Sequence, residues 1–333
     1  MIFVTGGTGF IGGYIIKKLV ENGEKVRAIK RTSPPPFFID SQILQQVEWV
    51  DCDILDPLGI RAYMEGADAV IHSAAKVSFH RSENAEMFNV NIQGTANVVD
   101  SCIELGIPRL IHISSVAALG RVKSGETVDE TKKWTDSNNN TPYAISKYHA
   151  EMEVWRGMAE GLNAVILNPG TVIGYGNWNQ SSCALFKNIY NEFPWYTEGV
   201  NGFVDVEDIA EAAYRMLRNN ISNERFILTG DNWSFKKLFD TIADALGKKK
   251  PSRKATPLAG EIAWRVEKLK GIIFNKKPLL TKETARVAHS STYFDNSKIK
   301  KFLPGFDFTP LEESVKKAAA RYLQAVEKGI LKN

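Results

Sequence analysis

The sequence predicts an α/β protein with a doubly wound parallel sheet and a smaller, mainly helical lobe. Short apolar segments alternate with helical segments through the first half of the chain, and a glycine-rich turn joins the first segment to the first helix. The second half changes to aromatic and helical segments. With 333 residues, the chain also exceeds the usual size of one compact core, which favours two lobes.

The predicted strands of the first half are short apolar runs, and the segments between them have helical spacing of apolar residues. The predicted strands are 1–5, 25–29, 47–50, 69–72, 110–114 and 164–168. The predicted helices are 10–22, 57–64, 86–105 and 142–158. Repeated strand–helix units are typical of a parallel sheet that is covered by helices on both faces.

The glycine-rich segment Thr5-Gly6-Gly7-Thr8-Gly9-Phe10-Ile11-Gly12 directly follows the first strand and opens the first helix. Its glycines satisfy G-x-G-x-x-G, which lets a pyrophosphate approach the backbone while the helix N-terminus supplies N–H donors. In this strand–turn–helix context the motif predicts a dinucleotide-binding Rossmann domain. The loop residues that we expect to contact the cofactor are Gly6, Thr8, Gly9, Phe10, Ile11 and Gly12.

The second half of the sequence is expected to form the lobe that recognises the substrate. Aromatic residues broken by Gly and Pro fill 174–200, and a strand is predicted over 225–229. The later predicted helices are 206–218, 234–246, 258–269 and 311–328. We expect residues 1–173 and about 201–230 to form the dinucleotide-binding domain, and residues 174–200 and about 231–333 to form the substrate-binding lobe. For helix 258–269, packing within this lobe is favoured over contact with a membrane surface.

The end of the second predicted strand favours NADP(H) over NAD(H), which stays possible. NAD-dependent enzymes usually place an acid there to bind the ribose 2′-hydroxyl. This chain has Lys30 and Arg31 instead, and a cation at this position is suited to a 2′-phosphate. Of the two, we expect Arg31 to bind the phosphate.

Tyr143 and Lys147 are four residues apart, so they share one face of the predicted helix. Tyrosine normally titrates near pH ~10, and a fixed lysine beside it lowers that pKa. Such a pair can exchange a proton with an alcohol or carbonyl oxygen while hydride moves at the adjacent carbon. The spacing is common on helices, so its meaning depends on the surrounding motifs.

Composition excludes several other classes of function. A net charge of +4 is too small to indicate a nucleic-acid partner. Cys52, Cys102 and Cys183 are odd in number and far apart, as in reduced cytoplasmic proteins, and the five His show no metal-ligand spacing. Met1 leads directly into a strand, so we expect no signal peptide. No apolar run approaches the ~20 residues that span a membrane, so we expect no membrane partner.

The order of these motifs resembles the extended short-chain dehydrogenase/reductases of the NAD-dependent epimerase/dehydratase superfamily, over roughly residues 1–310. His72-Ser73-Ala74-Ala75-Lys76-Val77-Ser78-Phe79 and Asn168-Pro169 are most similar to dihydroflavonol 4-reductase-like and 3β-hydroxysteroid dehydrogenase-like members. Further matching segments are Ser114-Ser115 before Gly120, Asn168 to Gly174, and Phe203 to Ala210.

The resemblance implies both the catalytic residues and most cofactor contacts. Its catalytic positions are Ser115, Tyr143 and Lys147. Its cofactor positions are Asp53 and Ile54 beside adenine, Ala74, Ala75, Lys76, Asn91, Pro169, Thr171 and Val172, together with Tyr143 and Lys147. Residues that follow these motifs and that we expect to line the substrate pocket are Ser78, His80, Tyr175, Trp178 and Phe186, although aromatic side chains there also suit a lobe core.

The expected function is NADP(H)-dependent reduction of a ketone or aldehyde, with a small-molecule carbonyl or alcohol as substrate. The resemblance also suggests a homodimer through the helix that carries Tyr143, although monomers occur in the family. One alternative is an NAD(P)-dependent nucleotide-sugar epimerase, although the acid of NAD-dependent sugar epimerases is absent after the second strand. Ser115-Val116-Ala117 also lacks the Asp-Glu pair of nucleotide-sugar dehydratases. A non-catalytic cofactor-sensing protein is the other alternative, but such proteins usually lose the Tyr or the Lys.

Overall fold

A computed structural model describes residues 1–137, 140–256 and 288–331 of the chain. The predicted helix 258–269 lies outside these residues. Within them, no helix is long and apolar enough to cross a membrane.

The centre of the fold is a parallel sheet of seven strands, which confirms the predicted α/β class. Its order is β11-β7-β5-β4-β1-β2-β3, and every neighbouring pair is parallel. The strands are β1 (Ile2–Thr5), β2 (Val26–Lys30), β3 (Glu48–Asp51), β4 (Ala69–His72), β5 (Leu110–Ile113), β7 (Ala164–Pro169) and β11 (Glu224–Leu228). The strand order reverses between β1 and β4, where the carboxyl ends leave a crevice for a ligand.

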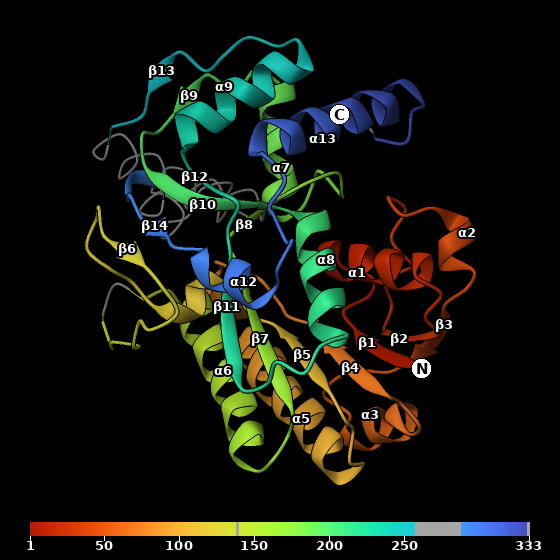
Figure 1. Ribbon diagram of the computed structural model, residues 1–333. Coiled ribbons are helices and arrows are strands. Elements are labelled where there is room, and N and C mark those ends of the chain that lie inside the picture. The colour runs from red at the N-terminus through yellow and green to blue at the C-terminus, as the bar shows by residue number, and fades with distance from the viewer. Residues whose placement is uncertain (138–139, 257–287, 332–333) are drawn as a thin grey trace.

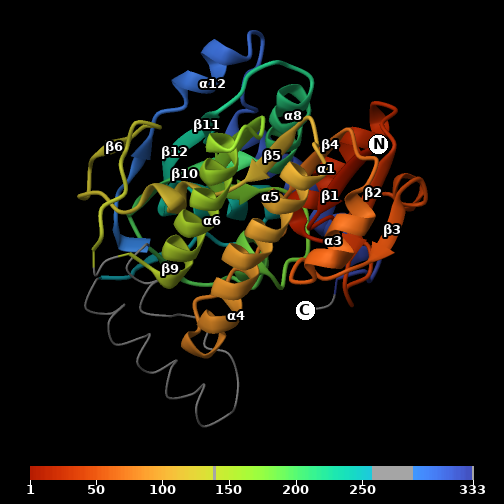
Figure 2. The same cartoon turned by 90° about the horizontal axis from the view of Figure 1, so that it is seen from below.

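Helices cover both faces of this sheet (Figure 1). One face carries α1 (Phe10–Glu21) and α8 (Val206–Leu217), which pack on each other. The other carries α3 (Pro57–Met64), α5 (Gly94–Glu104) and α6 (Pro142–Ala159), which lie in front of the strands in Figure 2. Successive β1 residues point to opposite faces, so Ile2 and Val4 join one core and Phe3 joins the other.

The predicted helix 86–105 is interrupted in the structure. It consists of α4 (Asn84–Phe88), a π-helical turn η2 (Asn89–Gln93) and α5. The π turn inserts extra backbone into the helix, a feature that often occurs at functional sites. Here it includes Asn91, whose side chain is buried.

The rest of the chain combines helices with short strands that the sequence did not predict. A three-stranded sheet joins β8 (Thr171–Ile173), β10 (Val200–Asp205) and β12 (Asp231–Ser234), and two-stranded pairs join β9 (Trp195–Tyr196) with β13 (Arg253–Lys254) and β6 (Thr127–Val128) with β14 (Tyr293–Phe294). Among the residues that the structure describes, the helices here are α7 (Ala184–Tyr190), α9 (Phe235–Leu246), α12 (Ser297–Phe302) and α13 (Leu311–Glu327), with α2 (Ser41–Leu44) following β2. In Figure 1, α7, α9 and α13 gather on one side of the parallel sheet.

Tyr322 of α13 is the centre of an aromatic cluster. Its ring stacks on Trp178 with an interplanar angle of 13° and lies 4.9 Å, centroid to centroid, from Phe186. Its hydroxyl donates to the carbonyl of Gly174 at 3.2 Å and accepts from the backbone of Gly176 at 3.0 Å. The last helix is therefore joined to the segment that follows β8.

Candidate active site

The glycine loop between β1 and α1 is shaped by close backbone contacts. Gly6 has φ +74°, and a Cβ there would lie 2.6 Å from the backbone nitrogen of Ala74. A Cβ at Gly12 would overlap the carbonyl oxygen of Gly6. A side chain at either position would therefore displace the loop from α1 or from the segment after β4.

The loop fits the pyrophosphate of a dinucleotide. Gly9 is the residue before α1 and has no side chain to cap the helix, so the first-turn N–H groups have no side-chain partner there. Free N–H donors and the helix dipole together favour an anion at this end. Thr8, Phe10 and Ile11, which we expect to contact the cofactor, remain partly exposed at the same turn.

The carboxyl ends of β2 and β3 place Arg31 beside Asp53. The Arg31 guanidinium lies 3.3 Å from the Asp53 carboxylate, and its side chain is 58% exposed. Lys30 instead pairs with Asp51 of β3 at 2.6 Å. The ion pair of Arg31 is exposed to solvent, so Arg31 can exchange Asp53 for another anion at a low cost in free energy. Next to Asp53, Ile54 is buried against α5.

Asn91 connects the segment after β4 to α6. Its Oδ1 atom accepts from the Lys76 backbone N–H at 2.7 Å, and its Nδ2 atom donates to the Lys76 carbonyl at 2.9 Å. Nδ2 also donates to the Ser146 hydroxyl at 3.0 Å, next to Lys147. The π turn thus places the side-chain amide of Asn91 so that it holds residues 74–76 in a fixed position relative to the helix that carries Tyr143.

A buried hydrogen-bonded chain below this segment was missed by sequence reasoning. His72 contacts the Thr5 hydroxyl at 2.6 Å through Nδ1 and the Thr95 hydroxyl at 2.9 Å through Nε2. The Ala74 N–H donates to Thr5 at 3.2 Å. Burial, and secondarily the charge of Lys147, lowers the pKa of His72 to about 3, so the imidazole stays neutral and acts as a structural link.

Helix α6 brings Tyr143 and Lys147 to the carboxyl end of the sheet. Thr141 caps the helix by accepting from the Ala144 N–H at 3.0 Å, and Pro142 occupies its first turn. The Lys147 ammonium is buried and donates to the Ile113 carbonyl of β5 at 3.1 Å. Burial lowers the pKa of Lys147 to about 8.

The phenol of Tyr143 has a raised pKa, which corrects the prediction that Lys147 lowers it. Burial is the main cause, and a hydrogen bond with the Ser115 hydroxyl acts in the opposite direction. Two of the three predicted catalytic side chains are therefore near enough to influence each other's charge. The ring of Phe79, which the sequence did not single out, contacts Tyr143 edge-on at 6.0 Å between centroids.

The turn after β7 completes the region. Asn168 donates from Nδ2 to the Ser115 carbonyl at 3.0 Å, so β7 fixes the backbone of the predicted catalytic serine. The Thr171 hydroxyl accepts from the Asn201 amide at 2.9 Å, and the Val172 carbonyl accepts from the Ser182 hydroxyl at 2.6 Å. The predicted residues Pro169, Thr171 and Val172 therefore lie at the same end of the parallel sheet as Ser115.

The residues predicted to line the substrate pocket separate into two groups. Ser78 and His80 lie in the loop after β4, where Ser78 Oγ accepts from the His80 N–H at 3.1 Å, and Phe79 between them contacts Tyr143. Trp178 and Phe186 are each 1% exposed and pack in the aromatic cluster with Tyr175. Their burial follows from the large apolar surface of their rings, and it gives no support to a substrate contact for them.

Comparison with known proteins identifies the family. The family model described as "NAD dependent epimerase/dehydratase family" matches residues 2–228. The chain is 28% identical to a putative dihydroflavonol 4-reductase of Synechocystis sp., covering 89% of this chain and 87% of that protein. It is 26% identical to 3beta-hydroxysteroid-dehydrogenase/decarboxylase isoform 1 of Arabidopsis thaliana, covering 94% of this chain and 77% of that protein.

The same fold occurs in UDP-glucose 4-epimerase from Thermotoga maritima, whose crystal structure contains UDP-glucose. The two chains superpose with a TM-score of 0.78 at 22% identity, over 98% of this chain and 99% of the other. The relatives confirm the resemblance to reductase-like and hydroxysteroid dehydrogenase-like proteins. The chain therefore belongs to the NAD dependent epimerase/dehydratase family and is an NAD(P)-dependent enzyme of the extended short-chain dehydrogenase/reductase type.

Proposed function

We propose that this protein is an NADP(H)-dependent reductase that converts a ketone or aldehyde into an alcohol with Ser115, Tyr143 and Lys147. The observation that supports this most directly is the buried Lys147 ammonium, which donates to the Ile113 carbonyl at 3.1 Å and so lies at the end of β5 that leads to Ser115, one helical turn after Tyr143. The parallel-sheet part of the chain would hold the cofactor, and the remaining lobe would recognise the carbonyl compound.

Each catalytic side chain then has a separate task. When bound, the nicotinamide supplies the hydride for the reaction. Tyr143 donates its proton to the substrate oxygen, and its raised pKa keeps the phenol protonated, as a proton donor requires. Ser115 donates a hydrogen bond to the same oxygen and stabilises the developing negative charge. Lys147 binds the nicotinamide ribose and stabilises the Tyr143 phenolate after proton transfer.

The proposed preference for NADP(H) rests on Arg31. Replacing Arg31 with Asp should raise the KM for NADPH about tenfold, because an exposed charge-assisted contact with a phosphate contributes roughly 1.5 kcal/mol. The KM for NADH should change by less than about threefold, since NADH lacks the 2′-phosphate. Steady-state kinetics with both cofactors provides the measurement.

Lys30→Gln is the matched control for this prediction. Lys30 precedes Arg31 but pairs with Asp51, so its loss should leave the ratio of the two KM values within about twofold of the wild-type ratio. An Arg31→Asp variant with an unchanged NADPH/NADH ratio would contradict the assignment.

Epimerisation of a nucleotide sugar is a second candidate because the fold is similar to that of UDP-glucose 4-epimerase. The two activities differ in net chemistry, since epimerisation consumes no reduced cofactor. NADPH oxidation should be followed against ketones, aldehydes, dihydroflavonols, steroids and UDP-sugars. Oxidation with carbonyl compounds supports reduction, whereas conversion of UDP-sugars without net oxidation supports epimerisation. Tight NADPH binding without either activity would favour a cofactor sensor.

We further propose a homodimer that forms through α6. This helix carries Met152, which is 37% exposed, and the partly buried Tyr148 and Trp155. Light scattering after gel filtration measures the mass and tests this. A reducing, cytoplasmic location also remains a proposal, supported by the three free cysteines in the described residues.

A further inference from the structure

A buried carboxylate lies one turn of α6 beyond the proposed catalytic lysine. Glu151 is four residues after Lys147 on α6, and its side chain is 1% exposed. Its Oε2 atom accepts from the Ser114 hydroxyl and from the Asn168 amide, each at 2.9 Å. Its Oε1 atom accepts from the Arg225 guanidinium at 3.1 Å. Four elements of the fold, namely α6, β7, β11 and the end of β5, therefore converge on this carboxylate.

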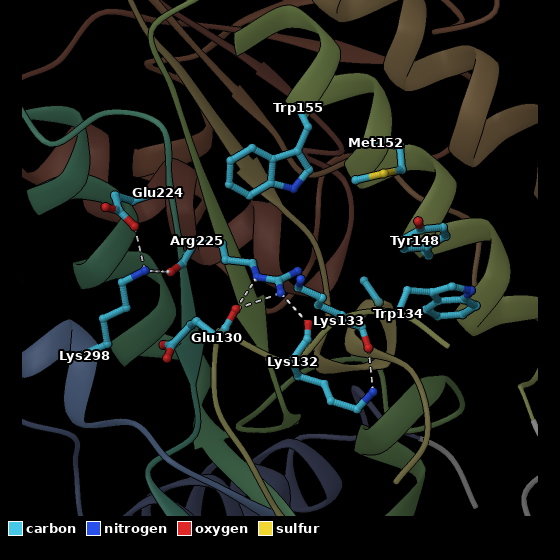
Figure 3. A pocket seen from close by; sticks show the side chains of 11 residues that line it. Glu130, Lys132, Lys133, Trp134, Tyr148, Met152, Trp155, Glu224, Arg225 and Lys298 are labelled. Atoms are coloured by element: carbon cyan, nitrogen blue, oxygen red, sulfur yellow. Dashed lines mark hydrogen bonds and ion pairs between the residues drawn. The ribbon is translucent and has the colours of Figure 1, made fainter. Parts of the chain in front are cut away.

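Arg225 of β11 is itself held rigidly. Its Nε and Nη2 atoms donate to the Glu130 carbonyl at 2.9 Å and 2.7 Å, and Nη2 also donates to the Lys132 carbonyl at 2.7 Å. The side chain is 18% exposed and lines a cavity of about 510 Å³, where Figure 3 shows these bonds. A guanidinium fixed at all three nitrogens can compensate a buried carboxylate, which would otherwise be unfavourable in the protein interior.

The positive charge of Lys147 is compensated by Glu151, because the other ionisable groups described around it are neutral. Burial lowers the pKa of His72 on β4 to about 3 and that of His112 on β5 well below its ordinary value, so both rings are neutral at pH 7. Tyr143 on α6 has a raised pKa and is also neutral. Burial lowers the pKa of Lys147 to about 8, and the negative charge of Glu151 acts against this effect.

We propose that Glu151, held by Ser114, Asn168 and Arg225, is a positioning residue that keeps Lys147 charged at neutral pH. The inference rests on the proposed function, because it is there that Lys147 has a catalytic task. Tyr143, Lys147 and Glu151 follow one another at four-residue spacing. Proton donor, ammonium and carboxylate thus form a line along one face of α6.

The test is the pKa of Lys147 itself, measured by NMR on protein labelled with ¹³C-lysine, with Lys147→Met used to assign the signal. Glu151→Gln removes the negative charge while keeping the shape of the side chain. Without that charge the ammonium is less stable, so the pKa of Lys147 should fall from about 8 by about one unit. A fall of about half a unit or more supports the proposal, and any smaller change overturns it.

Arg225→Gln is the matched control, because it breaks the same ion pair from the other side. It leaves the Glu151 carboxylate in place and bound by Ser114 and Asn168, so the Lys147 pKa should not fall. A purely structural role predicts that both variants shift the Lys147 pKa in the same direction. If Glu151→Gln does not fold, the double variant Glu151→Gln/Arg225→Gln removes both buried charges and is judged by the same threshold.

Kinetics provides a second readout on the same proteins. As the Lys147 pKa falls, the alkaline loss of NADPH affinity and of kcat should move to lower pH by the same amount in Glu151→Gln. An unmoved alkaline limb would contradict the proposal even if kcat had decreased. If wild-type protein reduces no carbonyl compound, the proposed function fails, whereas the NMR titration still decides the role of Glu151.

Discussion

Replacing Tyr143 with Phe should lower kcat for carbonyl reduction by about 10³-fold or more, while the Kd for NADPH stays within about threefold of wild type. The variant keeps the ring, and with it the contact with Phe79, but loses the proton that the substrate oxygen must receive. Single-turnover kinetics measures the chemical step, and quenching of protein fluorescence by NADPH measures binding.

Tyr148→Phe is the matched control for this result. Tyr148 lies five residues further along α6, and its ring stacks on Trp134 at 4.3 Å between centroids. Its kcat should remain within about twofold of wild type, because its hydroxyl has no part in the proposed proton transfer. If Tyr143→Phe retained more than a tenth of wild-type turnover, another group would have to donate the proton.

Gly12→Ala should weaken NADPH binding by roughly 100-fold, because even one methyl group overlaps the Gly6 carbonyl oxygen. Forced overlap of this kind displaces backbone at an energy of about 1–3 kcal/mol, and here the displaced backbone is the proposed pyrophosphate site. Equilibrium titration with NADPH measures the loss, and thermal unfolding without cofactor shows how far the fold itself is affected.

Gly23→Ala, just beyond the end of α1, separates the two effects. Its φ of +77° makes alanine unfavourable by about 1 kcal/mol, but an added Cβ meets no atom within 4 Å. Thermal stability should therefore fall while the Kd for NADPH stays at the wild-type value. Equal NADPH affinities for Gly12→Ala and wild type would exclude the loop as the pyrophosphate site.

The sequence predicts the parts of this fold whose signals are local. Apolar runs gave all seven parallel strands within one or two residues, because buried parallel strands are continuous in hydrophobicity. β8, β9 and β12 carry no such signal, since they have two to four residues and pair with strands distant in sequence. The π turn at Asn91 depends on hydrogen bonds to Lys76 and Ser146, which are visible only in the folded chain.

The candidate site shows the same division. Tyr143, Lys147 and the glycine loop have recognisable spacing, whereas Glu151 has a meaning only beside Arg225, which is 74 residues away in sequence. For the aromatic residues the sequence left two interpretations open, a pocket lining and a lobe core. Trp178 and Phe186 follow cofactor-side motifs, yet Tyr322, far along the chain, draws both into the core.

The packing of α13 also constrains when the protein can finish folding during synthesis. Arg321 donates to the Tyr14 hydroxyl of α1 at 2.8 Å, and the two residues are 307 positions apart. The first lobe can form its parallel sheet early, but the cluster around Tyr322 must wait until α13 has left the ribosome. Until then Tyr14 and Trp178 lack a central partner, so nascent chains that stop before α13 should expose apolar surface and require chaperones.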